Sequence, residues 1–253
     1  MNASLRKIGA LLQKDLVDLV KNPAMSVVCL MPIGFMLLYR IVIGDVTADA
    51  GLDARQAALA GQEIIKFTLG SALCMTIGMV GSMIEIYGIA EEKEKHTLRT
   101  LMLANVGAGE VAASKTLLAL LAISVDNLAC FFIAGGDVSW LGSYMALGLV
   151  GSIPVVLVSL VLGLACRDQM TAGFYSVPVL LVALVPLFGM ADENLARIAS
   201  LTPLGGIYDL MGMAVDGTLI SSEALSPLAV TAAWIAASCI LFAALFKRVA
   251  RDN

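Results

Sequence analysis

Charged residues are scarce in this chain of 253 residues, where Asp, Glu, Lys and Arg together make up 14%. Soluble globular domains usually have about a quarter, and disordered or nucleic-acid-binding chains depend on a high charge, so all three classes are poor fits. Hydrophobic residues instead reach 59%, and the mean hydropathy is +0.91. This balance is typical of a membrane protein.

Histidine is nearly absent, since His96 is the only one in the chain. A zinc hydrolase needs about three protein ligands, so His96 with Glu91-Glu92 does not make a metalloprotease site. The segment GEVAASKT, residues 109–116, lacks the last glycine of a phosphate loop and the strand that precedes one. We therefore expect no metal site, no catalytic residues, no nucleotide site and no cofactor in this chain.

The cysteines do not form a disulfide framework pattern. Their number, five, is odd, and they are spread through the apolar runs. We interpret them as free, buried thiols. They are Cys29, Cys74, Cys130, Cys166 and Cys239.

Six apolar runs are long enough for helices that cross a membrane, which need about 20 residues. The short alternating segments of a membrane β-barrel are missing. We therefore predict an all-α membrane protein, with six transmembrane helices in a single domain over residues 1–253. The predicted spans are 24–44, 64–90, 116–135, 141–165, 171–191 and 228–246.

The placement of Lys and Arg predicts that both termini are cytoplasmic. Twelve of the 16 basic residues flank the span ends on the side of the termini, and cytoplasmic loops carry such an excess. Arg55 and Arg197 are the basic residues clear of the membrane on the other side, where acidic residues collect. The twelve are Arg6, Lys7, Lys14, Lys21, Lys93, Lys95, Arg99, Lys115, Arg167, Lys247, Arg248 and Arg251.

Residues 4–21 form the first of three amphipathic stretches outside the spans. Ser4 is a suitable cap, and Asn22-Pro23 ends the pattern. We predict a helix that lies in the cytoplasmic interface. The alternative is a simple polar segment that leads into the first span. In either case we expect no cleavable signal peptide. Its apolar residues recur at three- and four-residue spacing: Leu5, Ile8, Leu12, Leu16 and Leu19.

The second stretch, AEEKEKHTLRTLMLANVGAGEVAASK, covers residues 90–115. Three glutamates at its start complement a helix dipole, an apolar stripe follows, and Gly107 and Gly109 end it. We predict a charged helix over 91–103 that docks on a soluble partner; the alternative is a solvated connecting helix. The residues expected to make the contact are Glu91, Glu92, Glu94, His96, Thr97, Leu98, Leu101 and Met102.

The third stretch, residues 192–227, lies on the outer side. Its pattern predicts two short amphipathic helices divided at Thr202-Pro203, each too short to span. We expect a re-entrant region that dips into the outer leaflet where other helices cover its backbone.

Polar residues also occur inside the predicted spans. A carboxylate at the middle of a span costs about 2.5 to 3.5 kcal/mol, so Asp126, with Asn127, should face protein or water. The pair is either part of a substrate path or subunit contact, or a structural element. Glu85 is expected to extend toward the cytoplasm or to join the charged helix. Small residues every four positions predict a close-packing ridge on the second span: Gly70, Cys74, Gly78 and Ser82.

The order of these parts resembles the membrane (permease) subunit of type-2 ATP-binding-cassette transporters. The most specific match is EEKEKHTLRTLMLANVGAGEVAASKTL, with Thr97-Leu98, Leu101, Leu103 and Lys115 at the family's motif positions. The segment KDLVDLVKNPA, residues 14–24, is similar to the family's elbow helix. The resemblance implies an elbow helix over 4–21, six spans, a coupling helix over 91–103 and short external helices.

The resemblance also implies a function and its partners. Two permease copies, or this chain and a paralogue, would form the pathway in the plasma membrane, and separate cytoplasmic ATPase subunits would supply ATP and Mg²⁺ chemistry. The chain itself would not be an enzyme, would contact membrane lipid and would bind no nucleic acid. We expect export of a small hydrophobic drug or peptide. The competing readings are an ATP-independent channel or secondary transporter that uses Asp126, and a non-transporting membrane anchor.

Overall fold

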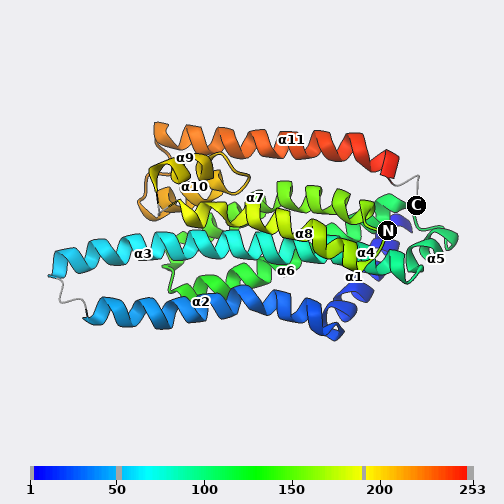
Figure 1. Cartoon of the computed structure of the whole chain (residues 1–253), viewed down its shortest axis with the longest axis horizontal. Helices are drawn as coiled ribbons and strands as arrows, with labels where there is room; N and C mark the ends of the chain where they lie inside the picture. The colour runs from blue at the N-terminus through cyan, green and yellow to red at the C-terminus, as the bar shows by residue number, and fades with distance from the viewer. Residues whose placement is uncertain (1–2, 50–52, 190–191, 250–253) are drawn as a thin grey trace.

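The chain folds into a bundle of helices in the computed structural model, which describes residues 3–49, 53–189 and 192–249 (Figure 1). The helices are α1 (Ala3–Lys21), α2 (Pro23–Asp49), α3 (Ala54–Met75), a π-helical segment (Thr76–Gly81), α4 (Ser82–Glu94), α5 (Thr97–Leu103), α6 (Ala108–Ala134), α7 (Val138–Ala165), α8 (Gln169–Leu184), a 3-10 turn (Val185–Phe188), α9 (Glu193–Ser200), α10 (Gly205–Val215), a second 3-10 turn (Ser222–Ala224) and α11 (Leu225–Val249).

Within these described ranges, six helices are long and apolar enough to cross a membrane. This confirms the all-α class with six candidate spans and indicates a multi-pass membrane protein. The second candidate span differs most from its prediction over 64–90. It is longer at both ends, because α3, the π-helical segment and α4 form one continuous helix. The six are Pro23–Val42, Arg55–Glu94, Ala108–Ala134, Val138–Ala165, Gln169–Phe188 and Ser222–Leu245.

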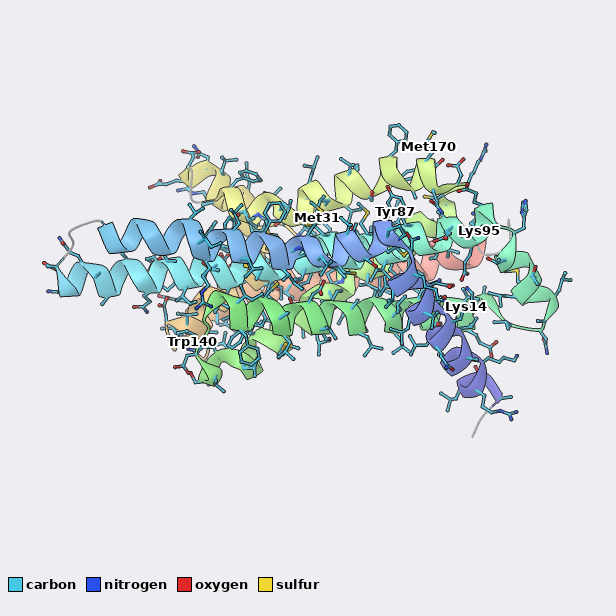
Figure 2. The ribbon with its side chains drawn as sticks, turned by 90° about the horizontal axis from the view of Figure 1, so that it is seen from below. Lys14, Met31, Tyr87, Lys95, Trp140 and Met170 are labelled. Carbon is cyan, nitrogen blue, oxygen red and sulfur yellow. The ribbon has the colours of Figure 1, made fainter. Side chains whose placement is uncertain are left out.

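The helices run side by side along the long axis of the molecule, and the bundle has two different ends (Figure 1). One end, called here the α5 end, carries α1, α5 and the last turns of α11. The opposite α10 end carries α9, α10, the last turns of α2 and the first turns of α3. Figure 2 shows α1 at a steep angle to the bundle, with Lys14 and Lys95 at the α5 end and Trp140 at the other.

The long helix α3–α4 lies at the centre of the bundle. In its most apolar window 89% of residues are buried, against 11% in each of α2 and α11, which are peripheral. Close approach depends on glycine: a Cβ on Gly70 would stand 2.6 Å from the Tyr208 ring, and one on Gly78 would stand 2.6 Å from Ala183 Cβ. Cys74 and Ser82 are fully buried on the same helix. Small residues thus let α8 and α10 pack tightly on the central helix.

Acidic side chains set the starts of several helices by capping free backbone N–H groups. Asp137 accepts from the Ser139 N–H at 2.8 Å where α7 begins. Asp168 accepts at 2.8 Å from the N–H of Thr171 where α8 begins. These caps place the turns between the spans, and the Asp168 cap lies at the α5 end.

The short helices α9 and α10 occur where two amphipathic helices were predicted. They meet at an angle of 104° across a break of four residues that includes Thr202-Pro203. Lys66 of α3 lies 2.7 Å from Asp216 at the end of α10, which ties this pair to the central helix. Their place in the outer leaflet stays a prediction.

Candidate functional site

The connection between α4 and α6 is the most exposed part of the α5 end (Figure 1). It was predicted as one helix over 91–103, and the structure corrects this. Helix α4 continues to Glu94, the chain turns at Lys95 and His96, and α5 covers Thr97–Leu103. His96 adopts a left-handed conformation (φ 56°), which breaks the helix. The three glutamates therefore end the long central helix and do not begin a separate one.

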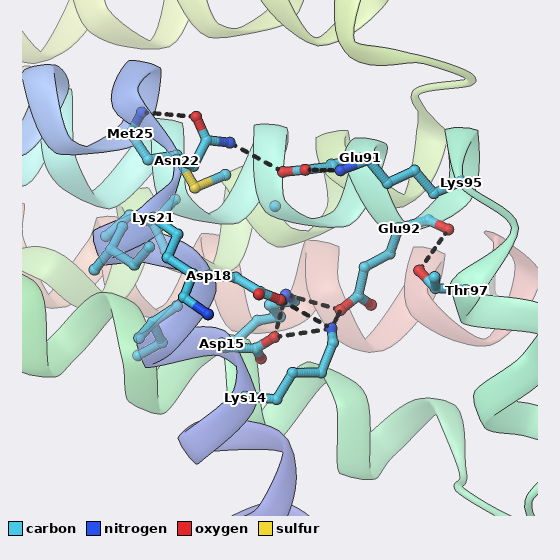
Figure 3. A pocket seen from close by; sticks show the side chains of 15 residues that line it. Lys14, Asp15, Asp18, Lys21, Asn22, Met25, Glu91, Glu92, Lys95 and Thr97 are labelled. Atoms are coloured by element: carbon cyan, nitrogen blue, oxygen red, sulfur yellow. Dashed lines mark hydrogen bonds and ion pairs between the residues drawn. The ribbon is translucent and has the colours of Figure 1, made fainter.

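A cluster of buried charges explains why α4 stays intact to this point. Lys115 Nζ, near the start of α6, donates to Asp15 Oδ1 of α1 at 2.9 Å and lies 3.0 Å from Glu92 Oε1 of α4. Lys14 Nζ also donates to Glu92 Oε1 at 2.9 Å (Figure 3), and Ser114 Oγ donates to Asp15 Oδ2 at 3.2 Å. We call Lys14, Asp15, Glu92 and Lys115 the ion cluster.

The ion cluster joins three helices that are distant in sequence. Asp15, Glu92 and Lys115 are each about 5% exposed, so these ion pairs are little screened by solvent. The Lys115 side chain passes beside Gly88, where a Cβ would stand 3.7 Å from Nζ, an ordinary van der Waals contact. Burial of a charge without a partner is costly, and here two cations face two anions. Helices α1, α4 and α6 are thereby held in one arrangement directly beneath α5.

The partly exposed lysines of this region have shifted pKa values. Partial burial disfavours the charged form of Lys14, but its hydrogen bond to Glu92 and the charges of Glu92 and Asp15 outweigh this and raise its pKa. On the exposed side, the hydrogen bond and charge of Glu91 raise the pKa of Lys95. Both lysines are therefore charged at neutral pH.

The structure separates the predicted docking residues into internal and external ones. Glu92 belongs to the ion cluster, and Leu101 and Met102 pack against Leu11 of α1 and Val111 of α6. Glu94 Oε2 accepts from the Gln169 N–H at 3.0 Å, which ties α4 to the start of α8.

The remaining predicted residues lie nearer the surface. His96 is exposed, Glu91 and Thr97 are half-buried, and the Leu98 side chain lies outside the described part of the chain. Thr97 Oγ1 donates to the Glu92 carbonyl oxygen at 3.1 Å, which fixes the turn into α5. Fewer of the predicted docking residues are therefore available at the surface than the sequence indicated.

Exposed residues of α5 that the prediction left out lie beside His96. Leu103 is 82% exposed, and Thr100 is exposed as well. Thr100 and Leu103 lie three positions apart on one face of α5, and His96 is at the turn immediately before the helix. The sequence contains this spacing but does not show which face of α5 points outward. We call His96, Thr100 and Leu103 the α5 face.

A cavity of about 330 Å³ lies beside the ion cluster, between α1, the start of α2 and α4 (Figure 3). Asn22, at the corner between α1 and α2, donates from Nδ2 to Glu91 Oε2 at 3.3 Å across this space. Its Oδ1 accepts from the Ala24 N–H at 3.0 Å and so caps α2. The corner and the end of α4 are thus joined at the rim of the cavity.

The polar residues predicted inside the spans lie in the interior of the bundle. Asn127 Oδ1 accepts a hydrogen bond from Thr76 Oγ1, which joins α6 to the first residue of the π-helical segment. Asp126 is buried, and its Oδ2 has no hydrogen-bond partner among the described residues. Glu85 is fully buried and so does not extend toward the cytoplasm, but it lies on α4, the helix that also carries Glu91, Glu92 and Glu94. A Cβ on Gly163 of α7 would stand 2.9 Å from the backbone carbonyl oxygen of Glu85.

The α5 end therefore combines an exposed helix with a rigid, charged support. Among the residues that the structure describes, no group of three or more His, Cys, Asp and Glu side chains could hold a metal ion. No protein-family model matches this chain, and no curated protein matches it significantly in sequence. The functional argument accordingly rests on the arrangement of α1, α4, α5 and α6.

Proposed function

We propose that this chain is the membrane-spanning subunit of an ATP-driven exporter of the type-2 ATP-binding-cassette class. One observation carries the proposal: α5 projects at one end of the bundle, while both helices that flank it continue directly into candidate spans (Figure 1). A separate ATPase subunit, which would hold ATP and Mg²⁺, docks on the α5 face. The α5 end is cytoplasmic, in accord with its Lys and Arg residues.

The ion cluster gives this docking a mechanical consequence. A force on α5 acts on the end of α4 and the start of α6, and these are joined to α1 through Lys115, Asp15 and Glu92. The three helices therefore move together. ATP binding in the partner favours one arrangement of the spans over another, because it stabilises the ATPase conformation that fits it.

The pathway forms between two membrane subunits, either two copies of this chain or this chain and a paralogue. Helices α2 and α11 have largely exposed apolar surfaces, which suit contact with lipid or with a second subunit. The substrate class proposed from the resemblance is a small hydrophobic drug or peptide. It agrees with the short connections at the α10 end.

A second candidate function is favoured by Asp126. Its buried Oδ2, without a partner in the described chain, lies on a candidate span where charge is costly. An ATP-independent channel or secondary transporter could use such a carboxyl as an ion or proton site. This reading requires transport by the isolated chain.

The two candidates are separated in proteoliposomes that contain the chain with or without its ATPase partner. The exporter proposal predicts ATP-dependent transport that Leu103→Asp reduces at least tenfold, because the charge disrupts the α5 face. Leu201→Asp, at an exposed leucine of the α10 end, should leave the rate unchanged. Proton-driven transport without any ATPase, abolished by Asp126→Asn, would replace the exporter by a carrier.

A further inference from the structure

Two adjoining cavities at the corner between α1 and α2 differ sharply in chemistry. The first, of about 330 Å³, is lined mainly by charged residues, and the second, of about 180 Å³, mainly by apolar residues of α2 and α4, including Val28 and Met83. Both share Asn22, Met25, Ile84 and Glu91 as lining residues. Together they form one site with a polar half and an apolar half, of a size usual for ligand sites.

The charges around the polar half are balanced. Its four basic residues are Lys14, Lys21, Lys95 and Lys115, and its four acidic residues are Asp15, Asp18, Glu91 and Glu92. Most of these groups already pair with one another, as in Lys14–Glu92, Lys115–Asp15 and Lys95–Glu91, so a ligand with a net charge would disturb the balance. A ligand that carries both charges, separated by a few bonds, matches this lining.

Two charged groups of the polar half lack partners and define what the ligand must supply. Glu92 Oε2 is buried and accepts no hydrogen bond from the described residues, whereas Oε1 is held by two lysines. Lys21, an exposed residue at the end of α1, lines the rim of the cavity and pairs with none of the side chains drawn around it (Figure 3). A buried carboxylate oxygen needs an N–H or O–H donor, and a free ammonium group favours a phosphate.

We propose that these two cavities bind one phosphatidylethanolamine molecule. Its primary ammonium donates to Glu92 Oε2, its phosphate lies against Lys21, and the first part of an acyl chain fills the apolar half between α2 and α4. The corner at Asn22 is where an amphipathic helix meets a candidate span, so it lies at the depth of lipid headgroups. This inference depends on α2 and α4 crossing a membrane but not on a transport function.

Other common phospholipids fit the site less well. The quaternary ammonium of phosphatidylcholine has no N–H and cannot satisfy Glu92 Oε2. Phosphatidylglycerol has hydroxyl donors but also a net negative charge, for which the already balanced lining offers no compensating cation. We therefore expect phosphatidylethanolamine to bind with about tenfold higher affinity than the other two phospholipids. This factor corresponds to the loss of one charge-assisted hydrogen bond.

The test is native mass spectrometry of the full-length chain in detergent, titrated with the three phospholipids matched in acyl chains. The wild type should retain one phosphatidylethanolamine at about tenfold lower Kd than the other two. Lys21→Glu should weaken its binding at least tenfold. Arg6→Glu is the matched control, since it reverses an exposed charge on the same helix away from the cavity, and it should have no effect.

The apolar half is tested separately. Val28→Trp fills it and should also lower the affinity, whereas Val27→Trp, at the neighbouring exposed position on α2, should not. Circular dichroism and thermal unfolding of each variant must match its control. Equal retention of all three lipids, equal behaviour of variants and controls, or equally tight binding of glycerophosphoethanolamine, which lacks acyl chains, would overturn the proposal.

Discussion

Lys115 and Asp15 stand 100 positions apart in the sequence, yet their side chains form a buried ion pair, with Nζ 2.9 Å from Oδ1. Glu92 lies 3.0 Å from the same ammonium, so one lysine joins α1, α4 and α6. These helices hold α5 at the end of the bundle. The pair thus connects α1 with the segment proposed to receive the ATPase.

Removal of Lys115 should destabilise the protein strongly. Lys115→Met leaves Asp15 buried without its main cation, and breaking a buried pair in this way costs about 3 to 5 kcal/mol. We expect the double variant Asp15→Leu/Lys115→Met to regain most of that loss, because no unpaired charge remains. The free energy of unfolding, measured by denaturant titration of the purified protein in detergent, checks both values.

Lys95→Met is the matched control for this experiment. Lys95 pairs with Glu91 in the same region, but its side chain is 63% exposed, so the substitution should change stability little. A Lys115→Met variant as stable as Lys95→Met would show that the ion cluster does not hold the three helices together.

Gly78 should resist enlargement because of its contact with α8. A Cβ at this position would stand 2.6 Å from Ala183 Cβ, so Gly78→Ala should cost about 1 to 3 kcal/mol through overpacking. Combination with Ala183→Gly should restore the contact and most of the stability. The same denaturant titration, applied to both single variants and the double variant, gives their coupling energy.

Gly34→Ala provides the comparison, since a Cβ at Gly34 of α2 meets no atom within 4 Å. It should leave stability unchanged or raise it slightly through better helix propensity. Equal effects at Gly34 and Gly78 would contradict the close packing of α8 on the central helix.

The start of α8 should be sensitive to acid. The backbone and hydroxyl hydrogen bonds from Thr171 hold the pKa of Asp168 below its ordinary value of about 3.9. Because the pKa of Asp168 is lower in the folded protein, its ionised form stabilises the start of α8 at a pH above the ordinary value. This stabilisation is lost as the pH falls through the folded pKa. Asp168→Asn keeps an acceptor oxygen but cannot titrate.

Amide hydrogen exchange at residues 170–172 measures this effect. The wild type should be better protected than Asp168→Asn at neutral pH, and the difference should disappear as the pH falls through the lowered pKa of Asp168. A difference that stays constant across this range would show that Asp168 ionisation does not stabilise the cap.

The spans and α1 were accessible to prediction because they depend on local pattern. The apolar period of residues 4–21 predicted the helix α1, although the residues that α1 buries are Leu11 and Asp15, and each predicted span overlaps an observed apolar helix. The roles of Glu91, Glu92 and Glu94 were not accessible in this way. Their partners Asn22, Lys14 and Gln169 lie 69 to 78 positions away, and no local rule indicates such contacts.

The inner and outer faces of α5 show a second limit. Leu101 and Leu103 are the same residue type two positions apart, yet the first packs on α1 and the second is exposed. The sequence indicated an apolar stripe but not its direction. The complete burial of Glu85 is likewise a property of the packed bundle, which hydropathy alone does not reveal.

The docking of an ATPase on α5 is tested most directly by site-specific photo-cross-linking in the native host. A photoreactive amino acid at position 103, compared with one at the exposed Leu201 of the α10 end, marks whatever contacts each surface. We predict that position 103, and not 201, cross-links to a protein with a phosphate-loop peptide, and that the isolated complex hydrolyses ATP. Cross-links from 103 to lipid or to this chain alone would contradict the account.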